Sequence, residues 1–318
     1  MSAAAVTPRP LGRTGLEVTP ICFGTSPLAS MSALYGYSVD EERAVATVRA
    51  VFDSAVNFLD TSNGYGEDGT AERRIGLAVR QAGGLPPRLV LGTKVDPDPR
   101  TGDFSGDRVR ASLEESMERL GVDHIPLLHL HDPERITFEE AIAPGGAVPA
   151  LAELRERGLV DHLGVAGGPV ELMRRYLGTG EFEVLLSHNR YTLLDRSAEP
   201  LFRYAADRGL GVLNAAPYGG GMLSKGPGVQ QKYAYGTRDD RIRDAAGAME
   251  AACERYDVPL AAAALQFSMR SEVIDSTVVG VSSPQRISQT VELAAVAIPD
   301  ELWSELEQAT PPRELWLD

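Results

Sequence analysis

The sequence is poor in cysteine, with only two among 318 residues. Cys22 lies in the apolar run ICFG and Cys253 in an alanine-rich stretch, and neither has the spacing of a metal-ligand set. We expect two buried thiols in a reducing compartment, and neither a disulfide nor a metal site.

Long hydrophobic runs are also missing. No segment reaches the roughly 18 uninterrupted apolar residues that a membrane-spanning helix requires. The N-terminal segment MSAAAVTPRPLGRTGLEV has no apolar core flanked by basic residues and a cleavage site, so it is not typical of a secretory signal. We therefore expect a cytoplasmic protein that has no membrane as a partner.

Positive charge is scarce, because 31 lysines and arginines stand against 45 aspartates and glutamates, for a net charge of −14. Nucleic acids and anionic membrane surfaces bind to basic patches, so neither is an expected partner, and a small-molecule substrate fits better. An anionic cofactor remains compatible with this charge, since backbone N–H groups and one or two local arginines can hold a phosphate. No pattern in the sequence indicates an oligomeric state.

What the sequence does contain is a regular alternation of short apolar or β-branched runs with amphipathic helical windows. This alternation is typical of βαβ units that form a parallel sheet. We predict eight strands, at residues 18–23, 57–61, 89–95, 125–131, 161–166, 184–188, 211–215 and 277–281.

The helical windows between these runs have apolar residues at spacings of three and four. Clear examples are residues 41–55, 107–120, 149–157 and 197–207. Several windows end in glycine, as at Gly121, Gly158 and Gly209. Glycine after the last turn is a common helix stop, so these residues predict where the helices end.

The first predicted strand leads into GTSPLASM and lacks the Gly-x-Gly-x-x-Gly turn that usually opens a doubly wound open sheet. Eight strand–helix units of this total length can instead close into a barrel. The sequence has no short-period repeat, low-complexity linker or charge run that marks a second domain. We therefore predict a single (β/α)8 barrel domain over residues 1–318.

Two connections are unusual for this architecture. The segment SPLASMSALYGYS follows the first strand, and AAPYGGGMLSKGPGVQQKYAYGTRDD follows the seventh and is the longest irregular stretch. Loops of such length are commonly functional. Both are expected at the carboxyl-terminal face of the barrel, where the active sites of this fold lie.

Four ionisable side chains stand at or just after neighbouring strand ends. Asp60 ends the second run, Lys94 lies near the end of the third, His131 ends the fourth, and Tyr65 follows Asp60 in the loop TSNGYG. Each alone has an ordinary explanation, as a turn cap, a snorkelling lysine, a core imidazole or a packed aromatic ring. Their joint placement predicts that they converge on one mouth of the barrel.

The chemistry of this group follows from charge. A buried lysine is costly unless a carboxylate neutralises it, and Asp60 on the neighbouring strand is the natural partner of Lys94. A cation near a phenol lowers the tyrosine pKa, so Tyr65 could exchange a proton with a carbonyl or hydroxyl near neutral pH. A barrel aldolase with Lys94 as a Schiff base is the alternative, but a paired carboxylate would hold the proton on that amine.

The sequence resembles the aldo-keto reductase superfamily in the motifs D-T-x-x-x-Y-G, G-T-K and LLHLHDP. The resemblance covers nearly the whole chain, from LGRTGLEVTPICFGT through DTSNGYGEDGTAERRIG to VVGVSSPQRISQTVEL. It implies that Tyr65 is the proton donor in reduction and the acceptor in oxidation, that Lys94 and Asp60 tune it, and that His131 orients the substrate oxygen.

A second histidine competes for the last of these roles. His129 lies two residues before His131 and would face the same side of the strand. In the family, proline stands two residues after the histidine, which matches His131-Asp132-Pro133. The resemblance therefore selects His131.

The resemblance also implies an extended nicotinamide dinucleotide across the carboxyl-terminal face, bound without a Gly-x-Gly-x-x-Gly turn. The residues expected to bind it are Gly24, Thr25, Asp60, Ser187, His188, Asn189, Ala215, Pro217, Gly219, Gly220, Gly221, Lys225, Val281, Arg286 and Thr290.

Two departures from the family pattern concern the nicotinamide ring. Ala166-Gly167 replaces the usual Ser-Asn, and Ala215 replaces a stacking tyrosine. Recognition of the carboxamide is therefore expected to depend more on His188 and Asn189.

The same resemblance predicts that NAD is preferred and that NADP can still bind. NADP-dependent members clamp the 2′-phosphate between a lysine at the end of the eighth strand and an arginine on the next helix. Arg286 matches the arginine, but Gly280 and Val281 stand at the strand end, and Thr290 replaces a common asparagine.

The segments NRYTLLD and NAAPYGGGML look most like the branch of NAD-linked aldose 1-dehydrogenases of the L-fucose or D-threo-aldose type. This resemblance implies oxidation of a sugar hemiacetal or alcohol. Alternatives are a pyridoxal 4-dehydrogenase, a general aldehyde or ketone reductase, and, from another class, a non-catalytic nicotinamide-binding accessory subunit. Expected to line the substrate pocket are Tyr35, Tyr37, Tyr65, His131 and Tyr218.

Overall fold

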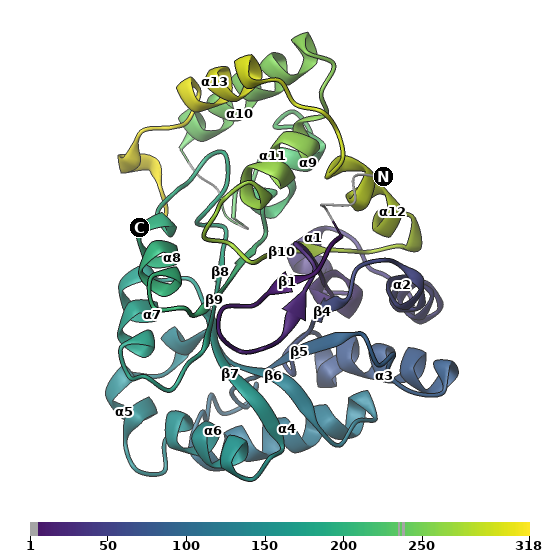
Figure 1. Cartoon of the computed structure of the whole chain (residues 1–318), viewed down its shortest axis with the longest axis vertical. Coiled ribbons are helices and arrows are strands. Elements are labelled where there is room, and N and C mark those ends of the chain that lie inside the picture. The colour runs from purple at the N-terminus through teal and green to yellow at the C-terminus, as the bar shows by residue number, and fades with distance from the viewer. Residues whose placement is uncertain (1–5, 235, 237–238) are drawn as a thin grey trace.

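The computed structural model describes residues 6–234, 236 and 239–318. The chain begins with a small antiparallel hairpin of β1 (Arg9–Pro10) and β2 (Glu17–Val18). Leu11 and Val18 of this hairpin are fully buried and pack into the inside of the barrel. The hairpin thus closes the amino-terminal end of the barrel, as Figure 1 shows.

Eight parallel strands form a closed barrel in the order β10-β3-β4-β5-β6-β7-β8-β9. The predicted (β/α)8 barrel is therefore confirmed. The strands are β3 (Ile21–Gly24), β4 (Phe58–Asp60), β5 (Val90–Val95), β6 (Ile125–His131), β7 (Val160–Gly167), β8 (Val184–His188), β9 (Gly211–Ala215) and β10 (Ser276–Gly280).

Helices surround the barrel (Figure 1). They are α2 (Glu41–Asp53), α3 (Thr70–Ala82), α4 (Gly106–Leu120), α5 (Phe138–Ile142), α6 (Ala147–Glu156), α7 (Val170–Leu177), α8 (Glu199–Ala206), α10 (Asp240–Arg255), α11 (Leu260–Met269), α12 (Pro284–Leu293) and α13 (Asp300–Gln308). Within the described residues, no helix is both long and apolar enough to cross a membrane.

The predicted helix ends have a local cause. The Asp40 side chain accepts a hydrogen bond from the backbone N–H of Arg43 and caps α2. Glycine in the left-handed region terminates α4 at Gly121, with φ 72°, and Gly158 and Gly209 follow α6 and α8 with φ 71° each. The glycine stops predicted from the sequence are confirmed.

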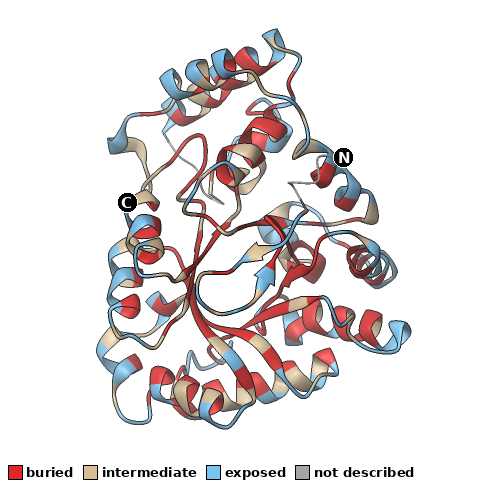
Figure 2. Cartoon of the chain, viewed as in Figure 1, coloured by how far each residue is buried: buried red, intermediate tan, exposed pale blue. Residues whose placement is uncertain are grey.

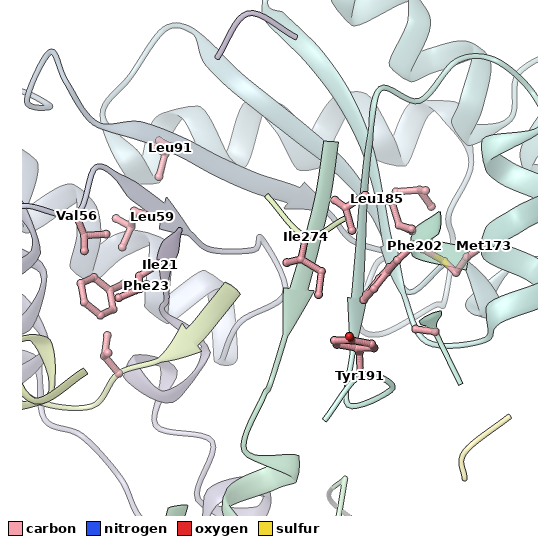
Figure 3. Close-up of a cluster of buried hydrophobic side chains, with 14 of the residues drawn as sticks. Ile21, Phe23, Val56, Leu59, Leu91, Met173, Leu185, Tyr191, Phe202 and Ile274 are labelled. Carbon is pink, nitrogen blue, oxygen red and sulfur yellow. The ribbon is translucent and has the colours of Figure 1, made fainter. Parts of the chain in front are cut away.

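The core has two parts. One lies between the barrel and the inner faces of the helices, where Phe23 and Leu59 lie together and Leu185 lies apart from them, near Phe202 (Figure 3). The other fills the inside of the barrel with side chains that include Phe58 and Leu127. Figure 2 shows the strands and the inward helix faces as almost wholly buried. This apolar filling leaves the carboxyl-terminal end of the barrel to the polar groups.

Two expectations about local structure are corrected. The first barrel strand begins at Ile21 and not at residue 18, because Pro20 lacks a backbone N–H and separates it from β2.

The two long loops are not wholly irregular, since they contain short helices. These are η2 (Ser26–Ala29) and α1 (Ser32–Tyr35) in the first loop, and η5 (Gly219–Gly221) and α9 (Met222–Lys225) in the second. Tyr235, Thr237 and Arg238 of the second loop lie outside the described residues.

Candidate active site

The structure brings Asp60, Tyr65, Lys94 and His131 together at the carboxyl-terminal end of the barrel. Asp60 and His131 are the last residues of β4 and β6, Lys94 lies near the end of β5, and Tyr65 follows β4. The Nζ atom of Lys94 lies 2.7 Å from both carboxylate oxygens of Asp60. The rings of Tyr65 and His131 meet edge to face, with centroids 5.6 Å apart.

The ammonium group of Lys94 has a polar partner on every side. Besides Asp60, it donates to the carbonyl oxygen of Thr61 at 2.6 Å, and it lies 3.3 Å from the phenolic oxygen of Tyr65. Only 1% of the Lys94 side chain is exposed, so the charge depends on these partners. A cation at this position stabilises negative charge on the phenolic oxygen.

His131 is held by a carboxylate that the sequence analysis did not identify. Its Nδ1 atom lies 2.7 Å from Oδ1 of Asp96, and its Nε2 atom lies 3.7 Å from Oδ1 of Asp132. Burial acts to lower the pKa of His131, but the two carboxylates outweigh it and raise the pKa above its ordinary value. One signal was available, because Asp96 stands two residues after Lys94 and so faces the same side of the chain.

Asp96 also contacts the loop that carries Tyr65. Oδ2 of Asp96 accepts hydrogen bonds from the Ser62 hydroxyl and, at 2.7 Å, from the backbone N–H of Gly64. Burial acts to raise the pKa of Asp96, but His131 and these donors outweigh it and lower the pKa to about 2. Asp96 is therefore a carboxylate near neutral pH.

His129 occupies a different environment from His131. It is fully buried, and neither of its ring nitrogens has a hydrogen-bond partner among the described residues. Burial, with the nearby charges of Lys94 and His131, holds its pKa well below the ordinary value. His131 lines the cavity above the barrel, and His129 does not. The geometry thus favours His131 as the histidine that meets a substrate.

A cavity of about 860 Å³ opens above these residues. Tyr65, Lys94 and His131 line it, together with Tyr35 from α1. Of the other residues expected in the substrate pocket, Tyr37 and Tyr218 are not part of this wall. Tyr37 packs against the Tyr35 ring, with centroids 5.9 Å apart. Tyr218 is partly buried and packs against the core outside the barrel, and this burial raises its pKa.

The residues expected to bind a cofactor fall into two groups. Gly24, Asp60, His188 and Ala215 line the cavity. The others lie outside that wall: Ser187 belongs to β8, and the rest lie on the loops and helices that follow the strands. These other residues are Thr25, Ser187, Asn189, Pro217, Gly219, Gly220, Gly221, Lys225, Val281, Arg286 and Thr290.

His188 and Asn189 form a hydrogen-bonded pair at the end of β8. The Asn189 amide nitrogen lies 3.1 Å from Nδ1 of His188, so Nδ1 accepts and Nε2 carries the ring proton. Burial is the main cause that lowers the pKa of His188, to about 4, which keeps the ring neutral. The buried Oδ1 atom of Asn189 has no hydrogen-bond partner among the described residues. Of this pair only His188 lines the cavity, so the pair presents the Nε2–H donor there, and Asn189 is buried outside the cavity wall.

The glycine cluster after β9 has a structural role of its own. Gly219, Gly220 and Gly221 have φ values of 56°, 72° and 103°. A Cβ atom on Gly219 would lie 2.2 Å from the ring of Tyr233, whose hydroxyl donates to the carbonyl oxygen of Asn189 at 2.9 Å. The cluster thus lets this loop pack against the end of β8.

Comparison with known proteins identifies the family of this chain. The aldo/keto reductase family matches residues 20–311. The chain is 32% identical to D-threo-aldose 1-dehydrogenase from a Pseudomonas species, over 93% of this chain and 95% of that protein. It is also 32% identical to pyridoxal 4-dehydrogenase from Microbacterium luteolum, over 96% and 98%, and to L-galactose dehydrogenase from Arabidopsis thaliana, over 96% and 94%.

A solved structure gives the same fold. An aldo-keto reductase from Bacillus halodurans superimposes with a TM-score of 0.77 at 23% identity, over 96% of each chain. At that identity the likeness concerns the fold, whereas the family match and the three relatives identify the kind of protein. The chain belongs to the aldo/keto reductase family and is an NAD(P)-dependent oxidoreductase.

Proposed function

We propose that this oxidoreductase, with residues 1–318 as one domain, is an NAD-linked aldose 1-dehydrogenase that oxidises a sugar hemiacetal at the anomeric carbon. The observation that carries the proposal is the cluster of Lys94, Asp60 and Tyr65 in the wall of a large cavity. The similarity to D-threo-aldose 1-dehydrogenase supports the substrate class.

In this proposal Tyr65 takes the proton of the substrate hydroxyl during oxidation and returns it during reduction. Lys94 stabilises the phenolate through its ammonium group, and the Asp60 carboxylate pairs with that ammonium in a buried place. His131 binds the substrate oxygen and fixes its position relative to Tyr65.

When bound, a nicotinamide dinucleotide supplies the acceptor or donor of the hydride. His188 fits its carboxamide, because Nε2–H of His188 can donate to the amide oxygen, and the Asn189 amide nitrogen fixes the His188 ring through Nδ1. Ala166 and Ala215, which line the cavity beside His188, leave room where many family members have larger side chains.

The preference for NAD rests on the segment after β10. Arg286 lies in the first turn of α12, but Gly280 and Val281 at the strand end provide no cation. A 2′-phosphate held by one cation instead of two loses a charge-assisted contact of about 1.5 to 3 kcal/mol, which corresponds to roughly tenfold or more in affinity. NADP binding is then weakened and not abolished.

The composition of the cavity wall supports a substrate with many hydroxyl groups. Asp98, Arg100, Asp132 and Arg135 line the cavity. Such side chains can donate to and accept from the hydroxyls of an aldose. Tyr35 in the same wall is the feature that favours the second candidate, pyridoxal, whose aromatic ring could stack on it.

A substrate screen tests this proposal. The protein is incubated with NAD or NADP and a panel of aldoses that includes L-fucose, with pyridoxal, and, in the reverse direction, with reduced cofactor and small aldehydes, while nicotinamide absorbance is followed. We expect the highest kcat/KM for an aldose with NAD. Faster reduction of every aldehyde near neutral pH would contradict the oxidative direction. Cofactor binding without any turnover would indicate an accessory subunit.

A further inference from the structure

Asp96 is a buried carboxylate that the proposed roles of Asp60, Tyr65, Lys94 and His131 do not use. It directly follows β5, and only 4% of the residue is exposed. Its backbone is fixed on both sides, since its N–H donates to the Ser112 hydroxyl at 3.1 Å and its carbonyl oxygen accepts from Nε of Arg108 at 3.1 Å. The carboxylate therefore has a defined position beside His131.

The contacts of Asp96 decide which nitrogen of His131 carries a proton. An ionised carboxylate only accepts hydrogen bonds, and Oδ1 of Asp96 lies 2.7 Å from Nδ1 of His131. The Ser62 oxygen lies 3.0 Å from the same nitrogen, while the Ser62 hydroxyl donates to Oδ2 of Asp96. Both oxygens near Nδ1 thus act as acceptors, and Nδ1 must be the donor.

This assignment limits what His131 can do at Nε2. With Nδ1 protonated, a neutral ring has a lone pair on Nε2, and only the imidazolium form has an N–H there. The carbonyl oxygen of an aldehyde or ketone has no hydrogen to share with a lone pair. His131 can therefore donate to such an oxygen only when it carries a positive charge.

We propose that Asp96 is a positioning residue that fixes the ring proton of His131 on Nδ1 and thereby makes the imidazolium the form of His131 that binds the substrate carbonyl oxygen. The inference rests on the proposed function of the site. It adds Asp96 as a fifth residue to the group of Asp60, Tyr65, Lys94 and His131. Proton transfer remains with Tyr65, and no bond to Asp96 or His131 is made or broken.

The charges around His131 are consistent with a stable imidazolium. Several titratable groups face His131 or act on its charge. They are Lys94 from β5, Asp96 directly after β5, His129 from β6, Asp132 and Glu134 after β6, Tyr65 from the loop after β4, and His188 from β8. Burial and Lys94 oppose the charged ring, but the two aspartates favour it and outweigh them, so the pKa of His131 is raised.

The test uses the folded full-length protein with its five histidines labelled with ¹⁵N. Long-range ¹H–¹⁵N spectra report which ring nitrogen is protonated, and a pH titration reports the pKa of each histidine. We expect His131 to carry its proton on Nδ1 when neutral and to titrate above the ordinary histidine range. An Nε2-protonated neutral ring in the wild-type protein would overturn the proposal, whatever the substrate is.

Two variants separate the electrostatic effect of Asp96 from loss of structure. Asp96→Asn should lower the pKa of His131 by about 1 to 3 pH units, the range expected when an adjacent charge is lost. The matched control is Glu183→Gln, which removes the carboxylate 3.1 Å from Nδ1 of His162 and should leave His131 unchanged. An unchanged His131 titration in folded Asp96→Asn would contradict the proposal.

Kinetics give a second readout if the site reduces a carbonyl. In the wild-type enzyme, the reduction rate should fall as pH rises through the pKa of His131, and Asp96→Asn should move that fall to lower pH. A variant that is merely less well folded would lose kcat at all pH values without moving the profile. Since the NMR titration needs no substrate, failure of the proposed function and failure of this inference give different results.

Discussion

The ammonium nitrogen of Lys94 lies 3.3 Å from the phenolic oxygen of Tyr65, inside a pocket where the lysine is almost fully buried. This contact links two strand ends, because Tyr65 follows β4 and Lys94 belongs to β5. It places a fixed positive charge where a phenolate would form, so a proton can leave Tyr65 without an unpaired buried charge.

Replacement of Lys94 by methionine tests this contact. Lys94→Met should raise the pH at which substrate oxidation becomes fast, because the phenolate loses its cation. It should also reduce the free energy of unfolding by about 3 to 5 kcal/mol, since Asp60 is left buried and unpaired. Lys232→Met, at an exposed position, is the control. An unchanged pH profile of the folded variant would show that Lys94 does not act on Tyr65.

The buried carboxyl of Glu72 predicts a pH dependence of stability. Burial raises its pKa to about 7, against hydrogen bonds from Thr93 and Arg119. The folded protein therefore binds a proton that the unfolded chain has released, so stability falls as pH rises from about 4.5 to 7.

Urea unfolding of the wild type and of Glu72→Gln at several pH values measures this effect. The wild type should lose on the order of 3 kcal/mol more than the variant between pH 4.5 and pH 8. Parallel curves for the two proteins would mean that Glu72 titrates as an ordinary carboxyl.

Packing inside the barrel predicts a strict requirement for glycine at one position of β7. A Cβ atom on Gly164 would lie 2.2 Å from Nδ1 of His129, which is fully buried and has no room to move aside. Gly164→Ala should therefore destabilise the protein by roughly 1 to 3 kcal/mol, as overpacking of a core does. Gly228→Ala, where the added methyl group meets no neighbour, should melt as the wild type does.

The cofactor preference predicts an unequal effect of losing Arg286. If this side chain is the single cation near a 2′-phosphate, Arg286→Ala should raise the Kd for NADP by roughly tenfold and that for NAD much less. Titration calorimetry with both cofactors measures the two values, and Arg313→Ala, an exposed substitution, is the control. Equal weakening of both would assign Arg286 to the adenine or ribose instead.

The barrel itself could be predicted from the sequence because its strands and helices have different hydrophobic periods. The predicted bounds of β5 and β6, and the predicted end of α4 at Gly121, agree with the structure to within one residue. The prediction that the first barrel strand begins at residue 18 is wrong. Residue 18 ends β2, and β3 begins at Ile21 after the chain changes direction around Pro20, although the apolar run is continuous there. Periodicity records which residues are buried, and it does not record where the chain bends.

The site was predictable to a similar degree and for a physical reason. Parallel strands bring their carboxyl ends to one face, so Asp60, Lys94 and His131 had to be neighbours. Asp96 was missed because a single aspartate after a strand has no pattern of its own, and its importance depends on the distance to His131. Tyr37 was placed in the pocket on residue type alone, and the loop conformation puts it against Tyr35 instead.

The central claim is that Tyr65 transfers the proton in the reaction, and the most direct measurement is the turnover of Tyr65→Phe. This variant keeps the ring and loses only the hydroxyl, so the fold and the affinity for NAD should stay close to those of the wild type. With the best substrate from the screen, kcat should fall by roughly 100-fold or more, the effect expected when a positioned proton-transfer group is lost. A folded, NAD-binding Tyr65→Phe with near-normal kcat would contradict the account.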